Sequence, residues 1–122
     1  MNRRVRFEQA IEAFETAVRL SGNWPINIGA LGHCYAVSGR RSEARQVLEN
    51  LIEMSKRRYV QPYELASIHA ALGEKDRAFE YLKRAYADRS QWLSYLNVDP
   101  RQDSLRSDPR FSDLIRRMNL QP

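Results

Sequence analysis

Apolar residues recur three or four positions apart along most of the chain, and this spacing places them on one side of an α-helix. Residues 7–20 have this pattern, and so do residues 28–35 and 44–51. Gly39 and the polar residues after it separate the last two segments. The pattern predicts an all-α protein in which residues 25–58 form a helical hairpin.

The same arrangement returns after 34 residues, a period typical of helical repeat proteins. The matching pairs are Leu31 and Leu65, Gly39 and Gly73, Ala44 and Ala78, and Leu48 and Leu82. Shifted backwards, Ala10, Phe14 and Ala17 fall on positions of the second helix of a unit. We therefore divide one domain, 1–122, into the second helix of a partial repeat (1–22), two repeats (25–58 and 59–92) and a capping tail (93–122).

Three small or rigid residues refine this prediction. We expect Gly32 to allow a close approach by a neighbouring helix, which offsets the roughly 1 kcal/mol that glycine costs inside a helix. We expect Gly39 to end the first helix in the left-handed conformation. Because proline is tolerated in the first turn of a helix, the first helix of the unit 59–92 should begin near Pro62, after an extended segment 59–61.

These residues resemble the tetratricopeptide repeat family over positions 6–92. The family pattern has Trp, Leu, Gly and Tyr in the first helix, then Ala, Phe and Ala in the second, followed by Pro. The positions that match it are Leu31, Gly32, Tyr35, Ala44, Ala10, Phe14, Ala17, Ala78 and Ala85. Departures include Ile28 and Pro62 at the Trp position and His69 at the Tyr position. The resemblance implies a right-handed superhelical stack of antiparallel helix pairs.

The tail contains Asp-Pro-Arg twice, at 99–101 and 108–110. Aspartate accepts hydrogen bonds from the free amides of a first helical turn, and proline needs no donor there. We expect a helical turn over 100–105 and a helix over 109–118, whose apolar face closes one end of the stack. The stretch 92–120 is also similar to the endings of repeat arrays in bacterial multidomain regulators.

The resemblance implies that the first helix of each unit lines a concave face that binds a polypeptide. By alignment, we expect an apolar partner-binding face formed by Ile26, His33, Val37, Val60, Tyr63 and Ser67. A rigid aromatic side chain loses little entropy on binding, so Tyr63 is the expected anchor. Simple surface is the alternative interpretation. Relatives that bind C-terminal carboxylates use Lys, Arg and Asn on this face, and this chain offers no such set.

The first predicted helix has apolar residues on more sides than one neighbour would cover. We expect Phe7, Ile11, Phe14 and Val18 to take part in self-association, which predicts a homodimer.

The net charge is +5, but most of the 20 basic residues alternate with 15 acidic ones. Three basic clusters occur, at residues 3–6, 56–58 and 106–117. Binding of nucleic acid or another anionic surface through them is the alternative function, and it requires that the clusters converge on one face.

The sequence contains none of the motifs that we would associate with catalysis, cofactors or bound metal. His69 is expected to be a structural residue, and the single cysteine, Cys34, a core residue. No segment has the length and hydrophobicity of a membrane span or a secretory signal, so we expect a cytoplasmic, non-catalytic protein that binds protein partners.

Overall fold

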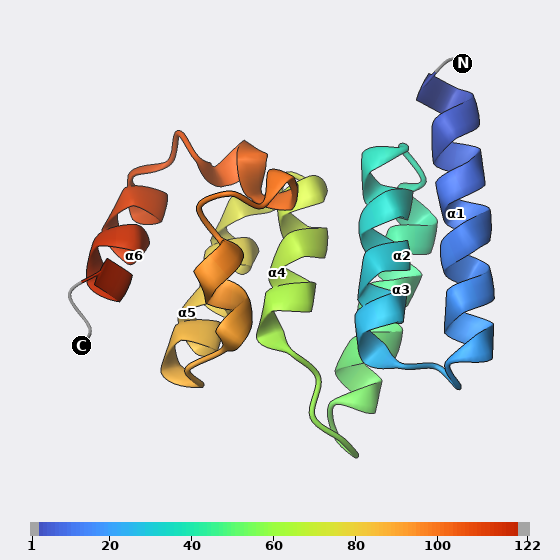
Figure 1. Ribbon diagram of the computed structural model, residues 1–122, viewed down its shortest axis with the longest axis horizontal. Coiled ribbons are helices and arrows are strands. Elements are labelled where there is room, and N and C mark those ends of the chain that lie inside the picture. Colours follow the sequence, from blue (N-terminus) through green and yellow to red (C-terminus); the bar gives the residue numbers. More distant parts are fainter. Residues whose placement is uncertain (1–2, 120–122) are drawn as a thin grey trace.

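The computed structural model describes residues 3–119, and all its regular elements over this range are helices (Figure 1). Residues 1–2 of the predicted partial repeat and residues 120–122 of the predicted tail lie outside the described residues. In chain order the elements are α1 (Arg3–Leu20), α2 (Pro25–Val37), α3 (Arg41–Met54), α4 (Pro62–Ala71), α5 (Lys75–Ala87), the 3₁₀ helices η1 (Gln91–Tyr95) and η2 (Pro100–Leu105), and α6 (Pro109–Asn119).

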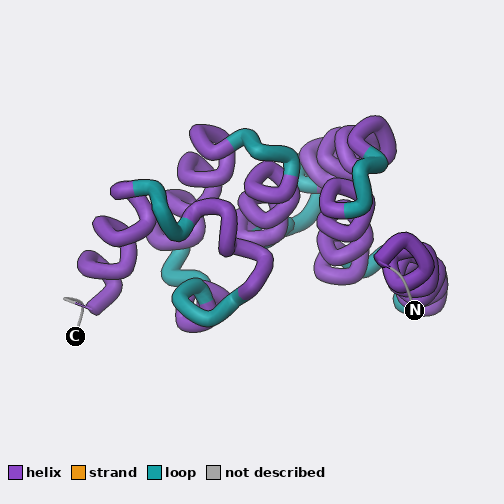
Figure 2. The backbone as a smooth tube through the Cα atoms, turned by 90° about the horizontal axis from the view of Figure 1, so that it is seen from above, coloured by secondary structure: helices purple, strands orange, loops and turns teal. Residues whose placement is uncertain are grey.

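The helices pack as a stack of neighbouring pairs. Helix α2 packs against α3, and α4 packs against α5, as two hairpins, and α2 also packs against α4. Helix α1 lies against α2 at one end of the stack, and α6 lies against α5 at the other (Figure 2). This arrangement is that of a tetratricopeptide-like helical solenoid, as the sequence predicted.

Gly32 lies where α2 packs tightly against both α3 and α4. A Cβ atom added to it would lie 2.7 Å from Ile68 Cδ1 and 2.7 Å from Val47 Cγ1, closer than carbon atoms can approach. The prediction of a close helix contact is therefore confirmed.

Glycine also ends the first helix of each hairpin. Gly39 has a φ of 88° and Gly73 a φ of 80°, both in the left-handed region that glycine adopts without steric cost. The next helix begins two residues after each glycine, at Arg41 and at Lys75. The predicted start at Pro62 and the irregular segment 59–61 are also confirmed.

Buried apolar residues form two clusters that meet at α4. One cluster contains residues of α1, α2, α3 and α4, among them Leu48, Leu51 and Ile68. The other joins α4, α5 and the tail around Leu82, Leu96 and Leu105. Helix α4 contributes residues to both clusters and therefore packs against both halves of the molecule.

The tail keeps the 34-residue spacing between helix starts, although its residues no longer match the repeat pattern. Helices α3, α5 and α6 begin at residues 41, 75 and 109, at intervals of 34 residues. Asp99 and Asp108 accept hydrogen bonds from the amides of Arg101 and Arg110, as predicted for helix starts. Phe111 and Leu114 are buried against α5 and the rest of the second cluster. The tail therefore packs where a further helix pair would lie.

Candidate partner-binding surface

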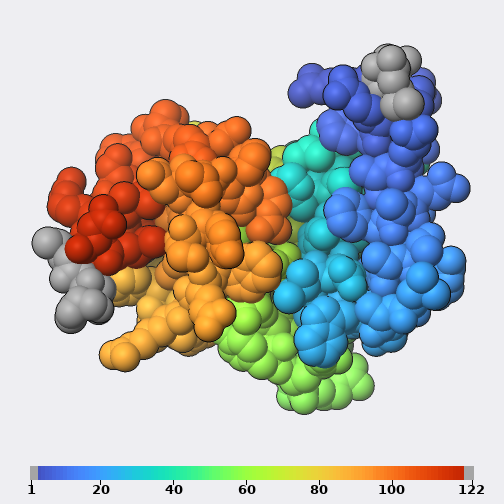
Figure 3. All heavy atoms as spheres, in the orientation of Figure 1, coloured from blue at the N-terminus to red at the C-terminus, as the bar shows by residue number. Residues whose placement is uncertain are grey.

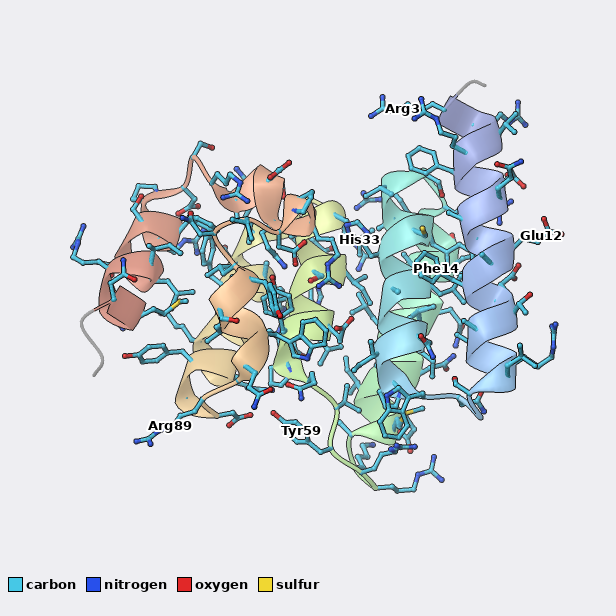
Figure 4. The ribbon with its side chains drawn as sticks, in the orientation of Figure 1. Arg3, Glu12, Phe14, His33, Tyr59 and Arg89 are labelled. Atoms are coloured by element: carbon cyan, nitrogen blue, oxygen red, sulfur yellow. The ribbon has the colours of Figure 1, made fainter. Side chains whose placement is uncertain are left out.

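Helix α2 carries a continuous row of partly exposed side chains, which we call the α2 stripe: Ile26, Ala30, His33 and Val37. Their spacing of four, three and four residues places them on one side of the helix. Val37 is 41% exposed, and the other three are partly exposed. His33 points from α2 toward the part of the molecule formed by α4 and the tail (Figure 4). Three of the six predicted partner-binding residues, Ile26, His33 and Val37, therefore lie on an accessible row.

The other three predicted partner-binding residues are buried, which corrects our expectation. Val60 is 5% exposed, and Tyr63 and Ser67 are 0% exposed. Tyr63 cannot be the anchor for an incoming partner, because its ring is already inside the protein. Its aromatic neighbour there is Trp92, whose ring lies 6.3 Å away in a stacked arrangement.

The element that covers α4 is η2. Tyr63 donates a hydrogen bond to Asp99 at 2.6 Å, and Gln102 donates one to the Ser67 hydroxyl at 2.8 Å. Ser104 donates to the carbonyl oxygen of residue 70 at 3.1 Å. The chain itself thus occupies the face of α4 that the alignment assigned to a partner.

Between the α2 stripe and η2 lies a buried charged group, Glu64, which is 1% exposed. Neither of its carboxylate oxygens has a hydrogen-bond partner, and Arg101 Nη1 lies 3.6 Å from Oε2. Burial raises the pKa of Glu64 to about 7, against the opposing effect of Arg101. A Cβ on Gly29 would lie 2.3 Å from the same oxygen, so α2 packs directly onto this carboxylate.

The pKa values of His33 and Asp99, two titratable residues close to Glu64, are both lowered. Burial, with Arg101 nearby, lowers the pKa of His33 to about 4, so its ring is neutral near pH 7. Burial would raise the pKa of Asp99, but hydrogen bonds from Arg101 and Tyr63 hold it below its usual value. The site thus holds a neutral imidazole and an ion pair between Asp99 and Arg101, with Nη2 at 3.0 Å from Oδ2.

One end of the α2 stripe opens into a hollow of about 350 Å³. Its lining residues are Trp24, Pro25, Ile26, Arg58, Tyr59 and Gln61. Trp24 and Tyr59 are 50% and 61% exposed, and the Arg58 guanidinium lies 5.0 Å from the centre of the Trp24 ring. Neither aromatic residue was predicted from the sequence. The available signal was a large aromatic residue in each linker that precedes a first helix, outside the helical apolar pattern.

The sequence model of the tetratricopeptide repeat family matches residues 63–87. The chain contains a tetratricopeptide repeat. This matched repeat consists of α4 and α5, which form the hairpin that shares Ala78, Leu82 and Ala85 with the second core cluster. Searches of curated proteins and of solved structures found no match. The similarity of the tail to bacterial multidomain regulators stays a prediction.

His69 lies at the end of the first helix of this tetratricopeptide repeat, and the structure gives it structural partners. Its Nδ1 lies 2.9 Å from Glu74 Oε1, and its ring stacks on Tyr81 at 5.5 Å between centroids. Glu74 is in turn paired with Arg45 of α3. These contacts tie the repeat to its neighbour. Cys34 is also buried, as predicted.

The predicted self-association residues lie on the first helix, and one of them needs correction. Ile11 is 3% exposed, because it packs into the first core cluster against α2. Phe7, Phe14 and Val18 are partly buried, and Figure 4 shows Phe14 pointing toward α2. Ile11 is therefore unavailable to a second copy, whereas the other three keep part of their surface.

The three basic clusters do not form one surface. Arg3 lies at the far end of α1, whereas residues 56–58 form the opposite edge of the molecule (Figures 3 and 4). In the tail, Arg106, Arg110 and Arg116 each pair with an aspartate at 3.2 Å or less. Clusters that lie at separate parts of the molecule, one of them paired with aspartates, provide a poor track for phosphates.

Residues 3–119 contain neither a candidate membrane-spanning helix nor a candidate metal-ligand cluster. No helix in this range is both long and apolar enough to cross a membrane. Within the same range no cluster of His, Cys, Asp and Glu has the geometry to hold a metal ion.

Proposed function

We propose that the chain is a scaffold that binds a segment of another polypeptide along the α2 stripe. Tetratricopeptide repeats in general bind protein partners, and the matched repeat gives this chain the same general role. The observation that carries the proposal is the contrast between α2 and α4. The row on α2 is partly exposed over its whole length, whereas Glu64 and Ser67, at equivalent positions of α4, are buried, and Gln102 of η2 donates a hydrogen bond to Ser67.

The chemistry of the α2 stripe favours an apolar segment. Ile26, Ala30 and Val37 have no polar side-chain atoms, and His33 is uncharged near pH 7. Covering such side chains is favourable by roughly 25 cal/mol for each Å² of apolar surface removed from water. A helix or an extended strand that places apolar residues against this row would gain this energy.

Site-specific photo-crosslinking tests this proposal. A photoreactive amino acid is placed at Val37, and in a control protein at Ile52 of α3, which is 43% exposed and so closely matched to Val37. Both proteins are irradiated in lysate, and the crosslinked species are identified by mass spectrometry. We expect a defined polypeptide to crosslink at position 37 and not at position 52.

The other outcomes decide against the proposal. Equal labelling at both positions would mean that the α2 stripe has no special affinity for polypeptides. Crosslinks to nucleic acid would support the alternative function through the basic clusters.

We also propose that α1 mediates self-association to a homodimer, through the exposed parts of Phe7, Phe14 and Val18. Val5 and Leu20, at the two ends of the same helix, are 40% and 80% exposed, but the helical spacing places them on the opposite side of α1. Sedimentation velocity tests this, with Phe14→Asp compared with Glu12→Asp on the exposed side of α1. A dimer that Phe14→Asp dissociates supports the proposal, and a monomer at high concentration overturns it.

A further inference from the structure

An exposed aromatic surface lies at the edge of the stack formed by the linkers between helix pairs. We call Trp24, Ile26, Arg58 and Tyr59 the aromatic edge. Trp24 precedes α2 and Tyr59 precedes α4, so the two residues, 35 positions apart, come from equivalent linkers of successive units. Tyr59 and Arg89 both lie at the lower edge in Figure 4, and residues around 55–60 form the lowest projection in Figure 3.

The arginines around this edge lack ion-pair partners. Within residues 3–119, no carboxylate oxygen lies within 4.0 Å of a guanidinium nitrogen of Arg57, Arg58 or Arg89. The tail arginines, by contrast, are paired with aspartates. The edge therefore combines an apolar hollow of about 350 Å³, which Arg58 lines, with an adjoining hollow that Tyr59, Asp88 and Arg89 line.

We propose that the aromatic edge binds an acidic segment of a partner polypeptide, in which one apolar side chain is flanked by Asp or Glu. The apolar side chain enters the hollow between Trp24, Ile26 and Tyr59. Its flanking carboxylates pair with Arg57, Arg58 and Arg89, which supply both attraction and orientation. This inference rests on the proposed function, because Ile26 belongs to both the α2 stripe and the edge, and it adds the chemical class of the partner.

Two contacts favour a peptide over single-stranded nucleic acid at this edge. One face of the Trp24 ring is covered by the Arg58 guanidinium, which leaves less of the ring for a base to stack on. The Tyr59 hydroxyl donates a 2.8 Å hydrogen bond to Asp88, whose negative charge repels a phosphate backbone that follows the edge. A peptide whose carboxylates lie only beside the arginines avoids that repulsion.

Fluorescence anisotropy with defined probes tests the proposal. Three short fluorescein-labelled peptides share one central phenylalanine, which is flanked by Glu, by Ser or by Lys, and labelled oligothymidylate is the fourth probe. Each is titrated with the full chain at low and at moderate salt. We expect the Glu-flanked peptide to bind at least about tenfold more tightly than the Ser-flanked one, and its affinity to fall as salt rises.

Three variants locate the binding. Trp24→Ala removes the apolar wall, and Arg57→Glu with Arg58→Glu reverses the charge. Lys75→Glu with Lys83→Glu makes the same change of charge on α5, at exposed positions away from the edge. We expect the first two proteins to lose about tenfold or more in affinity and the third to keep it, with thermal melting as the check on folding. Because Arg57 and Arg58 are exposed, the double variant tests the edge even if Trp24→Ala unfolds.

The proposal is overturned if no peptide binds, if the Glu- and Ser-flanked peptides bind equally, or if oligothymidylate binds more tightly than the Glu-flanked peptide. Equal losses in both double variants also overturn it, because the effect would then be one of net charge. Binding that is weakened by Val37→Asp and unaffected by Trp24→Ala would remove this inference and leave the proposed function standing. A dimer that only Trp24→Ala dissociates, with no peptide bound, would identify a second copy as the occupant.

Discussion

Gly32 lies in α2 at a tight contact with Val47 of α3 and Ile68 of α4. We expect Gly32→Ala to destabilise the protein by about 1–3 kcal/mol, although alanine is the better helix former. The new methyl group would press on Val47 and Ile68, which are both buried. Urea unfolding measures the change.

Glu12→Ala on the exposed side of α1 is the control for Gly32→Ala, because it alters helix propensity without a packing change. We expect its effect to stay within about 0.5 kcal/mol. A Gly32→Ala protein as stable as this control would contradict the close approach of the three helices.

Glu64 makes the free energy of unfolding fall as the pH rises. Its pKa is about 7 in the folded protein and near 4.5 in the unfolded chain, so the unfolded chain releases this proton first as the pH rises. The contribution of Glu64 to stability is therefore full below pH 4.5 and is lost between pH 4.5 and 7, by about 3 kcal/mol. We expect Glu64→Gln to be more stable than the wild type at pH 8 and equally stable near pH 4.5, as measured by urea unfolding.

His33 makes the free energy of unfolding fall as the pH decreases, over nearly the same pH range. Its folded pKa of about 4 lies below its ordinary value of 6.5, so its contribution is full above pH 6.5 and is lost as the pH falls toward 4. The wild-type profile combines both effects, and Glu64→Gln should leave the acid-side loss due to His33. A Glu64→Gln protein less stable than wild type at pH 8 would mean that the carboxylate is a net stabilising partner of Arg101.

At the scale of elements, the docking of η2 onto α4 decides which face of the repeat stays open. Tyr63 is the test residue, because it is fully buried and also binds Asp99 of the tail. We expect Tyr63→Ala to destabilise the protein by about 3–5 kcal/mol, the range for removing a buried aromatic ring. Tyr63→Phe keeps the ring and loses one hydrogen bond to a charged group, so we expect about 1–3 kcal/mol. Thermal or urea unfolding would show this order.

A small effect of Tyr63→Ala would contradict the packing of η2 on α4. It would also restore our first interpretation of Tyr63 as an exposed anchor.

The sequence predicted the helices. It also predicted those contacts that depend on the same type of residue recurring in the repeat pattern. Gly32, Gly39 and Pro62 act through steric rules that hold in any sequence, so their roles were predicted correctly. The covering of α4 was not predicted, because Gln102 and Ser67 form an ordinary hydrogen bond with no sequence signature. Ile26, His33 and Val37 of the α2 stripe were expected on an accessible face, and the aromatic edge was not, since Trp24 and Tyr59 lie in linkers outside the helical pattern.

At the scale of the whole molecule, the stack has two different ends. The tail covers α4 and α5 and packs where a further helix pair would follow, so this end is closed by the chain itself. The part of the molecule formed by α2 and the linkers before α2 and α4 keeps its apolar side chains partly exposed. We therefore propose that partners bind to the half of the stack that precedes α4.

Binding on the α2 stripe is tested most directly by the affinity of this chain for the partner that crosslinks at position 37. Val37→Asp places a charge on the α2 stripe, and Ile52→Asp places the same charge at a site of nearly equal exposure on α3. Isothermal titration calorimetry with the purified partner compares both variants with the wild type. We expect a loss of about tenfold or more for Val37→Asp and no change for Ile52→Asp, and equal affinities for the two variants would contradict binding on the α2 stripe.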